Sequence, residues 1–384
     1  MSHLLLRLRR SAACSVAPST TTRRFLSLAA PTRLLRQQQE AQLEDEYRDT
    51  GHAGAVSNTY VSPHPFVLEN GDVLHGAEVA YTTYGTLNAA RDNAIVLCHA
   101  LTGHSLVHQW WDAIVSPEWT DKYFLVCANV LGSCCGSTGP TVRDAVRLQL
   151  ELIQNELGVQ QVRSVIGGSM GGMQVLEWAF LGGPDFVKSF IPIASNSHHS
   201  AWQIGVSEVQ RQAIYMDPLY QNGHYDPANP PFQGLSLARQ IAMISYRSHA
   251  AYRDKYGREP DPSSTGRHPR FQVQSYLDYQ GQKFLDRFDV NSYVALTHLM
   301  DTHDVGRGRG GVARALATLT DQPALVVGVT SDVLYPLAEQ KELAEQLPRA
   351  SFHAIESPHG HDAFLLEQHA ISALAAEFID KHVS

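Results

Sequence analysis

A serine flanked by glycines is the strongest chemical signal in the sequence. Ser169 lies in the stretch Gly167-Gly168-Ser169-Met170-Gly171, after a short apolar run and before residues of helical character. The pattern Gly-x-Ser-x-Gly is typical of a sharp strand-to-helix turn, in which glycines allow close backbone packing and the hydroxyl is exposed at the tip. Ser169 is therefore a candidate nucleophile. Without chemical partners, the same stretch would be an ordinary glycine-rich turn.

A serine nucleophile needs a neighbouring base, and the base needs an acid that orients it. Asp332 directly follows one apolar run near the end of the chain, and His361 follows the next. The carboxyl ends of parallel strands meet at the edge where such sheets bind ligands, so both residues are expected beside Ser169. His359 is a competing candidate for the base. We favour His361 because it lies at the start of the following predicted helix.

Acyl transfer also needs N–H donors for the oxyanion that forms when the serine attacks a carbonyl. The N–H of Met170 begins the helix after the serine, where the helix dipole adds partial positive charge. The second donor is expected from the loop after an early strand, which is the stretch His99-Ala100-Leu101-Thr102-Gly103-His104. The N–H of Leu101 is the candidate in that loop.

The order of apolar segments predicts an α/β protein with the α/β-hydrolase fold, a mostly parallel, doubly wound sheet with an inserted helical lid. Continuous apolar runs at 94–99 and 124–129 are typical of strands buried on both faces. Earlier, Asn70-Gly71 predicts the turn of a hairpin at an antiparallel edge. A single amphipathic helix is predicted at 363–381.

The predicted domains follow from where these apolar runs stop and resume. Between 196 and 312, helical and polar segments replace the strand-like runs, which indicates the lid. We expect the hydrolase core to consist of residues 59–195 and 313–384. Residues 37–58 are polar and acidic and predict a linker.

The first 36 residues have the composition of a transit peptide, with seven arginines, many Ser, Thr, Leu and Ala residues, and no acidic residue. We therefore expect residues 1–36 to direct the protein to the mitochondrion. A plastid is the second possibility and the cytoplasm the third.

Composition excludes several classes of partner. The chain has 384 residues, 43% hydrophobic content and a formal net charge of −8, which argues against a nucleic-acid partner. No apolar run approaches the roughly 18 residues that span a bilayer, so no membrane partner is expected. The five cysteines lack the spacing of a zinc site, and we expect no metal.

Beyond these features, the chain resembles the homoserine O-acetyltransferase family. These proteins are acyltransferases of the α/β-hydrolase fold, and the family also contains serine O-acyltransferases. The matching stretches are 99–103, 129–133, 167–173, 208–214, 275–277, 279–284 and 360–362. The resemblance extends from about Thr59 to the end of the chain.

The resemblance implies these site residues: Ser169, Asp332 and His361 for catalysis, Leu101 and Met170 for the oxyanion hole, and Arg211 and Asp362 for the substrate. Chemistry agrees with the last two. A guanidinium such as Arg211 can bind an α-carboxylate through two hydrogen bonds, and Asp362 can pair with an α-ammonium group. The substrate would then be an amino acid.

The activity implied by the resemblance is transfer of an acetyl group from acetyl-CoA to L-homoserine through an acyl-serine, in a ping-pong reaction that belongs to methionine biosynthesis. The resemblance implies no permanently bound cofactor. It does imply a homodimer that forms through the lid. Serine as acceptor and succinyl-CoA as donor stay open, and an esterase or thioesterase is a more distant alternative. One departure is that Gly139-Pro140 runs directly into Thr141, where family members commonly carry a longer loop.

Overall fold

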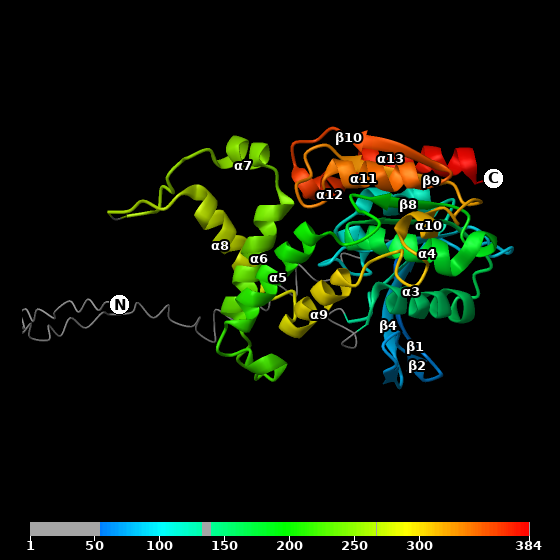
Figure 1. Ribbon diagram of the computed structural model, residues 1–384, viewed down its shortest axis with the longest axis horizontal. Helices are drawn as coiled ribbons and strands as arrows, with labels where there is room; N and C mark the ends of the chain where they lie inside the picture. The colour runs from blue at the N-terminus through cyan, green and yellow to red at the C-terminus, as the bar shows by residue number, and fades with distance from the viewer. Residues whose placement is uncertain (1–53, 133–139, 266, 384) are drawn as a thin grey trace, which may run out of the picture. The chain divides into compact units, whose positions relative to one another are not determined.

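A computed structural model describes residues 54–132, 140–265 and 267–383. In these residues eight strands form one sheet in the order β1-β4-β6-β5-β7-β8-β9-β10 (Figure 1). The strands are β1 (Val56–Val61), β4 (Glu78–Tyr84), β5 (Ala94–Cys98), β6 (Phe124–Ala128), β7 (Val162–Gly168), β8 (Phe190–Ile193), β9 (Ala324–Val329) and β10 (Ala350–Ile355). Strand β4 runs antiparallel to both of its neighbours, β1 and β6, and the other neighbouring strands are parallel to each other.

Successive residues of the central strands point into two different apolar cores, as the alternation of a strand requires. In β5, Val96 and Cys98 belong to one core and Ile95 and Leu97 to the other. The first core includes residues of α3 (Val142–Glu151), α4 (Met170–Phe186) and α11 (Leu337–Gln346), and the second includes residues of α2 (Pro117–Thr120) and α13 (Gln368–His382). Helices on both faces confirm the doubly wound sheet.

The chain between β8 and β9 forms the predicted helical lid. Its described helices are α5 (Ala201–Tyr215), η4 (Gln221–Gly223), α6 (Phe232–Tyr246), α7 (His249–Tyr256), α8 (Gln272–Phe284) and α9 (Val290–Asp301), followed by α10 (Val312–Leu316). Figure 1 shows α5, α6 and α8 beside one another, away from the sheet. The two ends of the lid are paired with each other, since the N–H of His199 donates to the carbonyl of His303 at 2.9 Å.

Two boundaries predicted from sequence are wrong. Strand β1 begins at Val56, inside the predicted linker 37–58, and pairs with β4 up to Thr83. Only Tyr60 of this edge strand is buried, so its sequence lacks an apolar pattern. At the other end, the predicted helix 363–381 is two helices, α12 (Ala363–Leu366) and α13, which are separated at Glu367.

The predicted hairpin is confirmed as β2 (Phe66–Val67) and β3 (Val73–Leu74), with Gly71 at a φ of 93° in its turn. It forms a separate two-stranded sheet. The predicted transit peptide 1–36 and residue Gly139 of the short connection lie outside the described residues. None of the helices in the described part of the chain is long and apolar enough to cross a membrane.

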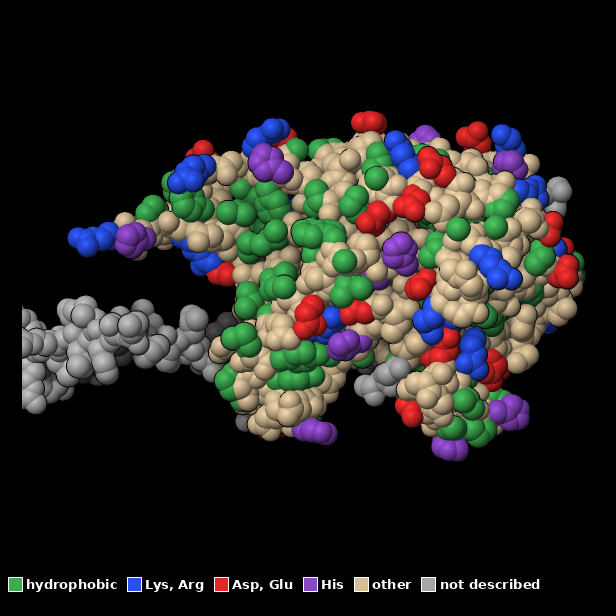
Figure 2. Space-filling model, in the orientation of Figure 1, with side chains coloured by type: hydrophobic (Ala, Val, Ile, Leu, Met, Phe, Trp, Pro, Cys, Tyr) green, Lys and Arg blue, Asp and Glu red, His purple; other side chains and the backbone are tan. Residues whose placement is uncertain are grey.

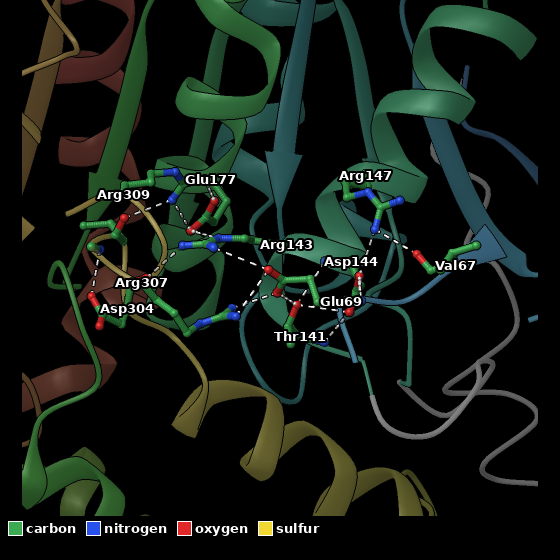
Figure 3. Close-up of polar contacts among 12 residues, drawn as sticks. Val67, Glu69, Thr141, Arg143, Asp144, Arg147, Glu177, Asp304, Arg307 and Arg309 are labelled. Atoms are coloured by element: carbon green, nitrogen blue, oxygen red, sulfur yellow. Dashed lines mark hydrogen bonds and ion pairs between the residues drawn. The ribbon is translucent and has the colours of Figure 1, made fainter. Parts of the chain in front are cut away.

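Buried charges fix the segment that returns from the lid to the core (Figure 3). Glu177 of α4 is 1% exposed and accepts hydrogen bonds from Arg143 Nε at 3.0 Å and from Arg309 Nη1 and Nη2 at 2.9 and 2.6 Å. Glu69, next to the hairpin turn, pairs with Arg307 at 2.7 Å and with Arg143 at 3.3 Å. The lid therefore ends in contacts with α3, α4 and the hairpin.

Replacing Glu177 should destabilise the fold. Glu177→Ala would leave Arg143 and Arg309 without their shared carboxylate, so the free energy of unfolding should fall by about 3 to 5 kcal/mol. Chemical denaturation measures the change. Lys122→Ala, which removes an exposed ion pair with Asp380, is the control and should cost less than about 1 kcal/mol. Equal losses for the two variants would contradict this account.

Candidate active site

Ser169 lies at a strained turn between β7 and α4. Its φ is 58°, a left-handed conformation that residues other than glycine rarely adopt. The neighbouring glycines allow this turn, because a Cβ on Gly171 would lie 2.1 Å from the carbonyl oxygen of Cys98, and one on Gly167 would lie 2.7 Å from the backbone of Gly171. No side chain fits at either position. The sharp turn predicted from sequence is confirmed.

The structure brings Ser169, His361 and Asp332 together in one hydrogen-bonded chain. Ser169 Oγ lies 2.8 Å from His361 Nε2, and His361 Nδ1 lies 2.7 Å from Asp332 Oδ2. The carboxylate can only accept, so Nδ1–H donates to Asp332 and Nε2 is left to accept the serine proton. The other carboxylate oxygen accepts the N–H groups of Leu334 and Tyr335 at 2.9 and 2.8 Å. Ser169, His361 and Asp332 are each less than 10% exposed.

Aromatic rings fix the plane of the imidazole. Tyr335 stacks on His361 with ring centroids 4.9 Å apart, and Phe364 and Tyr246 lie at 5.5 and 5.9 Å. Burial raises the pKa of Tyr335 well above its usual value. None of these rings was predicted as part of the site. The proximity of Tyr335 to Asp332 in sequence was the one available signal.

The loop that carries His361 packs directly against the lid. Gly360 has a φ of 69°, and a Cβ there would lie 2.6 Å from the backbone nitrogen of Ser248, between α6 and α7. The hydroxyl of Ser248 donates to the carbonyl of Pro358 in the same loop. The competing candidate, His359, does not contact Ser169 in the described structure. The lid and the loop that carries His361 are therefore positioned by each other.

The two predicted oxyanion donors have free N–H groups. Among the described residues, no protein acceptor receives a hydrogen bond from the N–H of Leu101 or of Met170. Both residues are buried, and Leu101 borders the same small cavity as Ser169. Free, buried N–H groups are rare in folded proteins, and a pair beside a serine hydroxyl can bind an oxyanion.

His99 holds the loop that contains Leu101. Its Nδ1–H donates to the carbonyl of Ala100 at 2.8 Å, and its Nε2 accepts the N–H of Val130 at 3.0 Å. This arrangement requires the neutral imidazole. Burial lowers the pKa of His99 to about 4, in agreement with it.

The cavity beside Ser169 is small, about 20 Å³. The core supplies Leu101, Leu334 and Tyr335 to its wall, whereas the lid supplies Ser207 and Gln210 from α5, Tyr246 from α6 and Met300 from α9. The reacting hydroxyl is thus enclosed mainly by the lid.

The predicted substrate-binding residues are each paired within the chain. Arg211 is 2% exposed and lies 2.6 Å from Asp301 and 2.9 Å from Glu208, while its Nη1 has no partner among the described residues. Asp362 lies 2.8 Å from Arg247 Nε. Burial raises the pKa of Asp362, and Arg247 opposes the shift. The structure records no contact of either residue with Ser169. The distant partners, Asp301 and Arg247, were not predicted, because nothing in the sequence links them to Arg211 and Asp362.

No group of three or more His, Cys, Asp or Glu residues in the described ranges is arranged to hold a metal ion.

Known proteins share this fold and this sequence. Residues 93–368 match the family described as alpha/beta hydrolase fold. Two solved structures superpose with a TM-score of 0.77. Esterase E22 is 20% identical over 85% of this chain and 100% of its own, and a homoserine O-acetyltransferase from Bacillus anthracis is 22% identical over 86% of this chain and 99% of its own. The protein is therefore a member of the α/β-hydrolase superfamily.

Sequence identity assigns it more narrowly. A homoserine O-acetyltransferase from Salinibacter ruber is 47% identical, with coverage of 84% of this chain and 97% of the relative. The chain belongs to the homoserine O-acetyltransferase family. That alignment extends over 345 positions. This is more than the number of residues in 84% of the 384-residue chain, so the alignment includes positions that this chain lacks.

Buried histidines should make stability depend on pH. Burial lowers the pKa of His303 from 6.5 to about 4, while its Nε2–H donates to the carbonyl of Asn196. Between these values the unfolded chain binds a proton that the folded chain does not, so stability falls as pH drops from 6.5 towards 4. The slope from His303 is at most about 1.4 kcal/mol per pH unit.

His303→Gln keeps a comparable donor but cannot titrate, so its unfolding free energy should fall less between pH 7 and pH 5 than that of the wild type. Urea denaturation at several pH values measures this. His64→Gln, at an exposed position, should retain the wild-type profile. Parallel profiles for His303→Gln and the wild type would show that His303 is not neutral when folded.

Proposed function

We propose that this protein transfers the acetyl group of acetyl-CoA to the side-chain hydroxyl of L-homoserine. The observation that carries the proposal is the Ser169–His361–Asp332 chain, with its 2.8 and 2.7 Å contacts, in a sequence 47% identical to a homoserine O-acetyltransferase. Acetyl-CoA acts as a co-substrate and no cofactor stays bound. The protein would act in methionine biosynthesis.

The first half-reaction forms an acyl-enzyme. His361 Nε2 takes the proton from Ser169 Oγ, which attacks the thioester carbonyl. The oxyanion accepts hydrogen bonds from the N–H groups of Leu101 and Met170. When the C–S bond breaks, the proton on His361 passes to the CoA thiolate, and Asp332 stabilises the imidazolium in between.

The second half-reaction repeats these steps with homoserine as the nucleophile. His361 accepts the proton of the homoserine hydroxyl, whose oxygen attacks the acetyl carbonyl. Collapse of the tetrahedral intermediate breaks the ester bond to Ser169, and His361 returns the proton to Ser169 Oγ. Water competes for the same acyl group, and walls supplied by the lid limit its access.

Arg211 and Asp362 are proposed to bind the ends of the amino acid. The unpartnered Nη1 of Arg211 supports a carboxylate at that position, because a buried guanidinium N–H without an acceptor is costly. Asp362 directly follows the base in sequence, and its carboxylate would pair with the α-ammonium group. Their present partners, Asp301 and Arg247, would keep both charges compensated when no amino acid is bound.

The deciding experiment follows CoA release with a thiol reagent. Acetyl-CoA and succinyl-CoA are each offered with homoserine, serine or no acceptor. We expect fastest release with acetyl-CoA and homoserine, and none with Ser169→Ala. A preference for serine would move the assignment to a serine O-acyltransferase, since one methylene changes kcat/KM by about 10- to 200-fold. Release that no amino acid accelerates would overturn the proposal in favour of a thioesterase.

Arg211→Lys separates substrate binding from acyl chemistry. Lysine keeps the charge but loses the two-pronged geometry, so kcat/KM for homoserine should fall about tenfold or more. Hydrolysis of p-nitrophenyl acetate, which has no carboxylate, should stay at the wild-type rate. Arg314→Lys, at an exposed position, is the control. Equal losses with both substrates would assign Arg211 a structural role only.

We propose that the lid forms a homodimer. Three exposed apolar residues, Trp202 and Val209 of α5 and Met216 directly after its end, recur every seven residues and share one helix face, with Met216 80% exposed. Leu237 and Ile244 form a similar pair on α6. Figure 2 shows hydrophobic side chains gathered over these helices. Light scattering should give twice the monomer mass for the wild type and the monomer mass for Val209→Glu with Ile244→Glu. A monomeric wild type would refute this.

We also propose that residues 1–36 direct import into mitochondria, on the strength of their arginine-rich, acid-free composition. The two homoserine O-acetyltransferases named above are bacterial. Fusion of residues 1–36 to a fluorescent protein tests the proposal, and fluorescence confined to plastids or to the cytoplasm would refute it.

A further inference from the structure

The two proposed oxyanion donors come from chain segments far apart in sequence, and one buried side chain connects them. Gln174 lies in the second turn of α4 and is fully buried. Its amide nitrogen donates to the carbonyl of His99 at 3.1 Å and to the carbonyl of Met170 at 3.4 Å. The first carbonyl begins the loop that contains Leu101, and the second belongs to the other donor residue itself.

The orientation of this amide is determined by its neighbours. The indole nitrogen of Trp178 can only donate, and it lies 3.0 Å from Gln149 Oε1. Gln149 therefore presents its NH₂ group to Gln174 Oε1, 3.1 Å away. Gln174 in turn must present its own NH₂ group to the two carbonyls. This series of hydrogen bonds begins at an indole N–H, which can only donate, and ends at two backbone carbonyls, which can only accept. Neither glutamine amide can therefore be flipped without losing hydrogen bonds.

The peptide group that carries the Leu101 N–H is held from its other side. Its oxygen, the carbonyl of Ala100, accepts the Nδ1–H of His99 at 2.8 Å. Gln174 holds the carbonyl of His99, one peptide earlier. Both carbonyls that precede the Leu101 N–H are thus fixed, while that N–H itself is free within the described chain.

We infer that Gln174 is a positioning residue for the oxyanion hole. It sets the spacing between the N–H groups of Leu101 and Met170. The inference rests on the proposed acyl chemistry of Ser169. A buried amide could instead serve stability alone, since each hydrogen bond contributes to folding. The positioning role and the purely stabilising role differ in one respect. Only the positioning role affects the binding of an oxygen between the N–H groups of Leu101 and Met170.

Gln174→Met keeps a similar length and removes the two donated hydrogen bonds. We expect kcat for acetyl transfer to fall about 10- to 100-fold, somewhat less than when an oxyanion donor is removed outright. The KM values should stay close to wild type, because ground-state contacts are unchanged. The inhibition constant of methylboronic acid should rise by a similar factor, since its tetrahedral adduct with Ser169 places an oxygen in the oxyanion hole.

Gln322→Met is the matched control. Gln322 is 2% exposed, and its amide nitrogen also donates to two backbone carbonyls, those of Ala179 at 3.3 Å and Val187 at 2.9 Å. Both variants lose the same kind of hydrogen bond, so both should melt at a lower temperature. Only Gln174→Met should change kcat and the methylboronic acid constant.

A second variant covers the case in which Gln174→Met does not fold. Gln174→Glu has nearly the same shape and can donate at most one hydrogen bond, so it should also weaken methylboronic acid binding. Wild-type binding by a folded Gln174 variant would overturn the inference. Methylboronic acid needs no amino-acid acceptor, so a wild type that fails to acetylate homoserine would refute the proposed function while this comparison still decides the role of Gln174.

Discussion

The site depends on one close backbone contact, that between Gly171 and the carbonyl oxygen of Cys98, where a Cβ would approach to 2.1 Å. Because α4 begins this close to the end of β5, the loop after β5 reaches the serine turn. Leu101 and Ser169 can then border one cavity although 68 positions separate them in sequence. A larger residue at position 171 would push α4 outward and separate Ser169 from that loop.

His361 and Asp332 reach Ser169 through the parallel sheet. Strands β7, β9 and β10 all end at one edge, so the residues that follow them meet although 192 positions separate Ser169 from His361. Electrostatics then fixes the lid over this edge. Glu177 binds the segment that leaves the lid, and the Arg247–Asp362 pair joins the end of α6 to the loop of the base.

Sequence reasoning succeeded where local chemistry determines structure. The glycines around Ser169 permit a single kind of turn, and strand order alone places Asp332 and His361 beside it. It failed where alternation was weak, as in β1, whose residues are mostly exposed. It also failed to find tertiary partners. Tyr335, Asp301, Arg247 and Gln174 occupy ordinary helical or loop positions in the sequence, and only packing of distant elements shows their contacts.

The size of the cavity beside Ser169 has a kinetic consequence. A volume of about 20 Å³ accommodates about one water molecule, less than an acetyl group or an amino acid needs. Helices α5, α6 and α9 of the lid supply much of the wall of this cavity, so displacement of these helices would enlarge the space beside Ser169. Motions of this kind take microseconds to milliseconds in other enzymes. In an enzyme whose lid must move before a substrate enters, the frequency of lid opening sets an upper limit on turnover, however fast the chemical step becomes.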